Sequence, residues 1–387
     1  MNGNLRVGNL FGIPFFINFS WFVVLGLVTW DYGTELGFAF PQLGGGAWLL
    51  GLVAALLLFA SVLAHELGHS FVAIRQGIAV NSITLFIFGG LASLGEESKT
   101  PAEAFWVAIA GPLVSIVLFT LLLLIGTFTP VTGPVAAVLN LMASINLALA
   151  LFNLIPGLPL DGGNVLKAIV WKITGKPYKG IAFASKLGQF FGWLGVGLGA
   201  LSVAGISDIG NFWTLVVGWF LLQNAGRYAQ AASIQEQLSD LTAKDAVLPN
   251  SPMVSGELSL REFANNYIIG NSVTWKKYLV TDEAGQWIGE ISVDAMKTIP
   301  TNDWWNVQVK ALMQPVEPIE TVQANQPLLE VVNLLEEKQL PTLVVLKEDG
   351  GLLGLLEKNS IIQLLQKQAS GSESSVEATP EQSEANV

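Results

Sequence analysis

Residues 47–74 read AWLLGLVAALLLFASVLAHELGHSFVAI, and this stretch decides the fold class. It is almost wholly apolar, and it is longer than the roughly 20 residues that a helix needs to cross a bilayer. The whole chain is 51% hydrophobic and only 13% charged, about half the charged fraction of a typical globular protein. The sequence therefore predicts an integral membrane protein with helical spans.

The same stretch holds the only two histidines of the chain, His65 and His69, with Glu66 beside the first. Residues four apart share one face of a helix, so the two imidazoles can hold one metal ion. The carboxylate can act as general base toward a metal-activated water. The pattern H-E-x-x-H also arises by chance, but a charge at mid-membrane costs roughly 2.5–3.5 kcal/mol on insertion scales. We therefore predict a catalytic metal centre here.

A catalytic zinc has three protein ligands and one open position, so a third ligand is expected. The chain has no Cys and no further His. The best candidate is Asp161, in the segment NLIPGLPLDGG at residues 153–163, where prolines break a helix and glycines permit a turn. The alternative is a proline-rich helix end with a solvated aspartate.

The wider pattern predicts a multi-pass α-helical membrane bundle of about six spans in the cell membrane. Lys and Arg occur in alternate links only, which places both termini and the soluble C-terminal part in the cytoplasm. The same topology brings His65, His69 and Asp161 to one depth. The expected spans are Pro14–Trp30, Ala47–Ile74, Ala104–Phe128, Gly133–Ile155, Lys186–Ala204, which is rich in Gly, and Ile209–Tyr228.

Residues 81–94, between the second and third spans, alternate as strands do around Gly89-Gly90 and predict a hairpin. A transmembrane substrate must unwind before its peptide bonds can be attacked, and an unwound segment needs backbone partners. The hairpin either supplies an edge for strand addition or only shields the site.

Charge divides the chain near residue 235. Nine basic and eight acidic residues precede this point, whereas ten basic and 22 acidic residues follow it. We expect a membrane domain at 1–234, a soluble domain at 235–368 and a disordered tail, rich in Ser and Glu, at 369–387. An acidic soluble part without a basic stripe argues against nucleic-acid binding.

The soluble part shows an internal repeat of α/β type. Each unit has a strand, an acidic turn with Gly, a return strand and a helix, and the first strands start 64 residues apart, at Tyr278 and Thr342. This spacing predicts two copies of one module, and two unrelated hairpins are the alternative. The expected strands are Tyr278–Thr281 and Trp287–Ile291, then Thr342–Leu346 and Leu352–Leu356.

These features together resemble the site-2 protease family of intramembrane zinc metalloproteases. The matching motifs are His65-Glu66-Leu67-Gly68-His69, the segment at 153–163, and Ala110-Gly111-Pro112 with Ser115. The resemblance implies that His65, His69 and Asp161 bind Zn²⁺. It also implies Glu66 as general base and Asn153 as a residue that holds the substrate or the developing oxyanion, although a structural amide is an alternative for Asn153.

Six spans followed by a CBS-like pair resemble one branch of that family. Such pairs imply an adenosine nucleotide and a homodimer as partners. The sequence departs from the usual Gly-x-x-Ser/Thr-x-x-Asp ribose pattern, because Gly289 and Ser292 are followed by Ala295, and Gly354 by Glu357.

The predicted function is hydrolysis of a peptide bond in or near the transmembrane segment of a membrane-anchored protein, in regulated signalling. One alternative is a CBS-regulated transporter, which predicts charges along a pathway or inverted repeats. The other is a catalytically inactive relative that binds membrane partners. The complete set of candidate site residues argues against the inactive relative.

Overall fold

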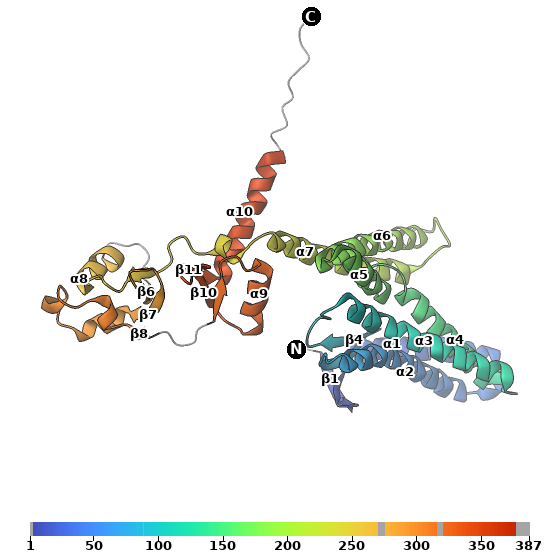
Figure 1. Cartoon of the computed structure of the whole chain (residues 1–387). Coiled ribbons are helices and arrows are strands. Elements are labelled where there is room, and N and C mark those ends of the chain that lie inside the picture. The colour runs from blue at the N-terminus through green and yellow to red at the C-terminus, as the bar shows by residue number, and fades with distance from the viewer. Residues whose placement is uncertain (1–2, 88, 270–274, 316–319, 377–387) are drawn as a thin grey trace, which may run out of the picture. The chain divides into compact units, whose positions relative to one another are not determined.

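The computed structural model of the chain describes residues 3–87, 89–269, 275–315 and 320–376. The chain divides into two compact units, Met1–Ser233 and Ile234–Val387, which are described one at a time (Figure 1). Long helices dominate the first unit, and small sheets with short helices make up the second (Figure 1). The helices that begin in the first unit are α1 (Ser20–Ala39), α2 (Gly46–Arg75), α3 (Pro101–Phe128), α4 (Gly133–Asn153), α5 (Asp161–Thr174), α6 (Pro177–Val203) and α7 (Phe212–Ser239).

Three helices within the described residues are long and apolar enough to cross a membrane, namely α2, α3 and α4. The longest, α2, has 30 residues, which at a rise of 1.5 Å per residue is about 45 Å, more than the roughly 30 Å of a hydrocarbon core. These helices coincide with the second, third and fourth expected spans. The first, fifth and sixth expected spans overlap α1, α6 and α7.

The predicted start of the first span, at Pro14, is wrong. Residues Ile13–Asn18 form strand β2, which pairs with β1 (Asn4–Leu10) on one side and with β3 (Val80–Phe86) on the other. Helix α1 therefore begins only at Ser20. Alternation in this short apolar stretch cannot distinguish a strand from the first turns of a helix until a pairing partner is known.

The hairpin predicted within residues 81–94 is confirmed. Strand β3 pairs antiparallel with β4 (Gly89–Leu94), and Ile83 and Leu85 point into the core at 0% and 2% exposure. The four strands form one sheet in the order β1-β2-β3-β4, so β4 is an edge strand. Phe88 lies outside the described residues.

Glycines allow several helix pairs of the first unit to approach closely, as is common between membrane helices. A Cβ at Gly51 in α2 would lie 2.8 Å from the Cα of Gly33 in α1. A Cβ at Gly195 in α6 would lie 2.9 Å from the Cα of Gly218 in α7. The Gly-rich composition of the fifth expected span therefore serves close packing, as predicted.

The break between α4 and α5 positions Asp161. Helix α4 ends at Asn153 and α5 begins at Asp161, and the intervening Leu158 donates its N–H to the carbonyl of Ala184 in α6 at 3.1 Å. The chain folds back so tightly that a Cβ at Gly163 would collide with the backbone of Gly157. Only glycine fits there, which explains the Gly pair after Asp161.

The second unit contains two sheets of matching topology. In one, β5 (Met253–Ser255) runs parallel to β6 (Lys277–Thr281), and β6 pairs antiparallel with β7 (Trp287–Ser292). Strand β7 in turn pairs antiparallel with β8 (Gln314–Pro315). In the other, β9 (Thr321–Gln323) runs parallel to β10 (Thr342–Leu346), which pairs antiparallel with β11 (Leu352–Glu357). A parallel strand precedes each hairpin, which two unrelated hairpins do not explain.

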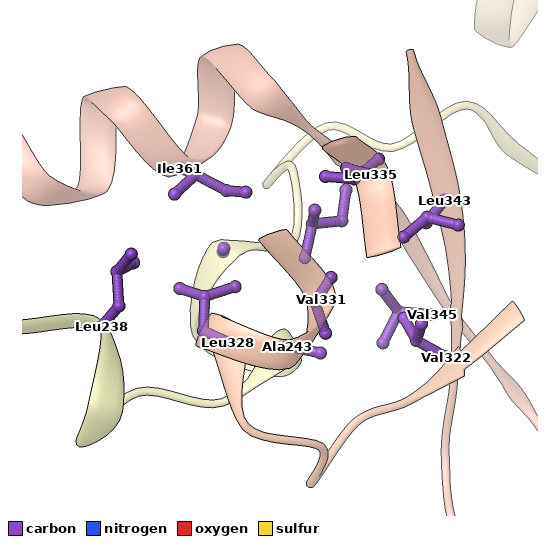
Figure 2. Close-up of a cluster of buried hydrophobic side chains, with 11 residues drawn as sticks. Leu238, Ala243, Val322, Leu328, Val331, Leu335, Leu343, Val345 and Ile361 are labelled. Atoms are coloured by element: carbon purple, nitrogen blue, oxygen red, sulfur yellow. The ribbon is translucent and has the colours of Figure 1, made fainter. Parts of the chain in front are cut away.

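The core of the second copy lies between its sheet and helices α9 (Leu328–Glu337) and α10 (Lys358–Val376). Figure 2 shows Val331 of α9 facing Val345 of β10, with Ile361 of α10 on the opposite side of the same cluster. Helix α8 (Leu260–Phe263) contributes to the corresponding core of the first copy. Helix α10 continues past the expected boundary at 368, and residues 377–387 of the expected tail lie outside the described residues.

Candidate metal centre

Helix α2 presents both histidines on one buried face. His65 is 3% exposed and His69 is 9% exposed, and their ring centroids lie 5.0 Å apart. This is the geometry expected of two residues one helical turn apart.

Asp161, the first residue of α5, meets both rings. Its Oδ2 lies 3.0 Å from His65 Nε2 and 3.3 Å from His69 Nε2. One ligand atom from each of the three residues lies within 4.8 Å of the others. In a tetrahedral zinc site with bonds of about 2.1 Å, neighbouring ligand atoms lie roughly 3.4 Å apart. The two separations between Asp161 and the histidines are close to that value, and two nitrogens with one oxygen are a donor set that suits a zinc ion.

The far nitrogens of both rings are held by α3. His65 Nδ1 lies 3.0 Å from the hydroxyl of Ser115, which is fully buried. His69 Nδ1 donates to the carbonyl of Val107 at 2.6 Å. Such partners orient metal-binding imidazoles, and here they leave Nε2 of each ring facing Asp161.

Helix α3 approaches the site closely because residue 111 is glycine. A Cβ at Gly111 would lie 2.7 Å from His65 Nε2 and closer still to His69 Nε2. Any side chain larger than hydrogen would occupy the space of the ligating atoms.

Glu66 faces the edge strand β4. The backbone N–H of Ala92 donates to its carboxylate, and a Cβ at Gly90 would lie 2.8 Å from Glu66 Cδ. The strand therefore defines the position of this carboxylate next to the histidines.

The site opens into a cavity of about 390 Å³. His65, Glu66, His69, Asp161 and Asn153 all line it, so the structure brings every predicted site residue together. The side-chain amide of Asn153 donates to the carbonyl of Leu149, one turn earlier in α4, at 3.0 Å. This hydrogen bond is consistent with a structural role for the Asn153 amide. The position of Asn153 in the cavity wall is consistent with a role in holding the substrate.

Comparison with known proteins identifies the family. The profile of peptidase family M50 matches residues 53–138 and 129–195. A protein of Synechocystis sp. named "Putative zinc metalloprotease sll0528" is 57% identical over 370 residues, which cover 95% of this chain and 97% of that protein. The chain belongs to peptidase family M50.

Other M50 relatives are more distant. The protein named "Zinc metalloprotease MJ0392" of Methanocaldococcus jannaschii is 30% identical over 264 residues, 68% of this chain and 71% of that protein. The solved "Site-2 Protease from Methanocaldococcus jannaschii" is 29% identical with a TM-score of 0.43, covering 58% of this chain and 95% of that one. The CBS domain profile matches residues 309–367 of this M50 chain.

These findings confirm the resemblance to the site-2 proteases, the zinc metalloprotease activity and the CBS domain. Zinc is the metal of this M50 chain, and its apolar helices make it a membrane protein. Membership of M50 argues against the transporter alternative.

Sequence reasoning missed several residues at the M50 site. Val107 and Ala92 act through backbone groups, which leave no signal in residue type. Ser115 was noted only within a family pattern, without its contact to His65. Lys167 also lines the cavity. It lies six residues after Asp161, with Asn164 midway between them, and this spacing could have indicated that Lys167 lies near the site.

Proposed function

We propose that His65, His69 and Asp161 hold the zinc ion and that Glu66 is the general base of an intramembrane endopeptidase. Its substrate is a membrane-anchored protein, cleaved in or near its transmembrane segment as part of regulated signalling. The observation that carries this proposal is the meeting of three ligand atoms within 4.8 Å, two of them from α2, a helix that is long and apolar enough to span a membrane.

The chain's own groups account for the proton transfers. Bound zinc supplies Lewis acidity, which polarises the scissile carbonyl and the attacking water. Glu66 accepts the proton released by that water and passes it to the leaving amine, so that the C–N bond breaks into a carboxylate and an amine. The N–H of Ala92 keeps the Glu66 carboxylate aimed at this position. Asn153, at the cavity wall, holds the substrate or the oxyanion.

The zinc content of purified protein tests the site. About one zinc per chain is expected, with loss in His65→Ala and Asp161→Ala variants of confirmed fold. The variant Glu66→Gln is expected to retain zinc but not cleave a membrane-anchored reporter. Zinc-loaded parent protein that cleaves no member of a transmembrane reporter library would favour the inactive relative instead.

Strand addition at β4 is our proposal for how an unwound substrate binds. The sheet order leaves β4 with an open edge, and Ala92 on that strand directs its N–H toward Glu66. A strand added there would run past the general base. Because only every second residue of an added strand pairs with the edge, N-methylation scanned along a substrate peptide should reduce cleavage with a period of two. A uniform response would favour the shielding role.

We further propose six spans, with α1, α6 and α7 crossing in addition to α2, α3 and α4, and both termini in the cytoplasm. The charge bias of the links supports this orientation. The chain has no Cys, so single cysteines can be introduced cleanly at Lys176 and Asp208. A membrane-impermeant thiol reagent applied outside intact cells should label the cysteine at 208 and not that at 176, and the reverse would refute the orientation.

The CBS pair is proposed to regulate the protease, with an adenosine nucleotide as ligand and a homodimer as assembly. In the second copy, the hydroxyl of Ser360 already donates to the carbonyl of Ala246 at 2.7 Å, and a Cβ at Gly354 would collide with Ser251 Oγ. These contacts engage Ser360 and crowd Gly354, the two residues of that copy that stand at the first and last positions of the ribose pattern, and so support the first copy as the nucleotide site. Calorimetric titration with ATP and AMP tests binding, and light scattering in detergent tests the dimer.

A further inference from the structure

Two charged side chains line the cavity beyond the metal centre and its general base. They are Lys167 of α5 and Glu97 of the loop between β4 and α3. Lys167 Nζ and Glu97 Oε2 form an ion pair at 3.3 Å. The pair joins α5 to the loop between β4 and α3.

The two members of the pair differ in exposure. The side chain of Lys167 is 17% exposed and that of Glu97 is 80% exposed. An ion pair with a well-hydrated partner adds little stability, so another carboxylate can replace Glu97 at small cost. The side chain of Lys167 is mostly buried, and a charge near a protein interior interacts more strongly with its neighbours than one in open water.

Lys167 lies six residues after the metal-site residue Asp161, in the same helix α5. Asp161, Asn164 and Lys167 follow one another at intervals of three in α5, so each lies about one turn from the next, and all three line the cavity. Six residues of helix rise about 9 Å, and an extended strand covers about 3.3 Å per residue. A strand bound parallel to α5 would therefore bring its third residue from the scissile bond level with Lys167.

We propose that Lys167 is a specificity-determining residue that selects an acidic side chain about three residues from the scissile bond. The selected acidic residue lies on the side of the scissile bond that leads toward the loop carrying Glu97. In the free enzyme, the Glu97 carboxylate occupies the position beside Lys167 that the acidic side chain of the substrate would take. This inference rests on the proposed proteolytic function, because it names a substrate feature of the same site.

A set of single-span membrane reporters tests the proposal, with Glu, Gln or Lys placed in turn at five positions on each side of the cleaved bond. The parent protein should cleave the Glu reporter at the third position at least about tenfold more efficiently in kcat/KM than the Lys reporter, as a charge mismatch at a binding site predicts. The double variant Glu97→Lys/Lys167→Glu keeps an ion pair but reverses the charge inside the cavity. It should invert the preference.

Matched variants separate selection from loop anchoring. Lys172→Glu changes an exposed lysine of the same helix and should leave the preference unchanged. Lys167→Met should reduce the ratio of kcat/KM between the Glu and Lys reporters to within about twofold. A parent protein without a charge preference near the third position, or a double variant that keeps the parent's preference, would overturn the proposal. Should no reporter be cleaved by the zinc-loaded parent, the proteolytic function itself fails and this inference fails with it.

Discussion

Replacing Gly111 by alanine should empty the metal centre. The added methyl would lie 2.7 Å from His65 Nε2, which is 0.7 Å short of the 3.4 Å at which ordinary van der Waals contact begins. Ligand distances in metal sites vary by about 0.2 Å, so the required displacement exceeds that tolerance more than threefold. His69 Nε2 lies closer still and must move further.

The assay is zinc content by metal analysis together with cleavage of a membrane reporter. Zinc affinity should fall sharply, and kcat/KM should fall at least about 100-fold, as a misplacement of about 1 Å in a catalytic site predicts. Gly126→Ala is the matched control on the same helix, because the nearest neighbour of the new Cβ, Asn140 Oδ1, would lie 3.8 Å away. That variant should keep both zinc and activity.

A Gly111→Ala protein with full zinc and full activity would refute the assignment of His65 and His69 as ligands that share one ion beside α3. Circular dichroism and a thermal melt in detergent distinguish local displacement from unfolding. Retained helicity with lost zinc is the expected combination.

Three further predictions concern other parts of the chain. Ser115→Ala should lower zinc affinity roughly 10- to 100-fold, because it removes the partner that orients His65, and a competitive chelator titration measures this; unchanged affinity would show that the contact is incidental. Gly90→Ala should displace Glu66 and lower kcat about 100-fold, while zinc content stays at the parent level. A loss of zinc in this variant would contradict the separation between zinc binding and proton transfer by Glu66. Leu343→Ala, at a fully buried position of the CBS core, should destabilise the second unit by about 2–5 kcal/mol in denaturant unfolding of the full chain, with no change in zinc.

Much of the architecture could be predicted because it depends on local patterns. Apolar length indicated the α2, α3 and α4 spans, and alternation indicated the 81–94 hairpin and both strand pairs of the second unit. The start of α1 was mispredicted because β2 is short and apolar and is defined by strands on either side of it. Pairing between distant segments is not visible in a short apolar run.

The sequence by itself determined the chemistry of the site. Two histidines at helical spacing within an apolar span, with a glutamate beside them and one aspartate after a broken helix, left few other metal ligands in a chain without cysteine. Tertiary structure alone decided how these groups meet: α5 brings Asp161 to His65, 96 residues earlier, and Ala92 of the edge strand holds Glu66 by a backbone N–H. The physical reason is that residue type and spacing specify which groups can react, whereas contacts made by backbone atoms or between distant segments exist only once the chain has folded.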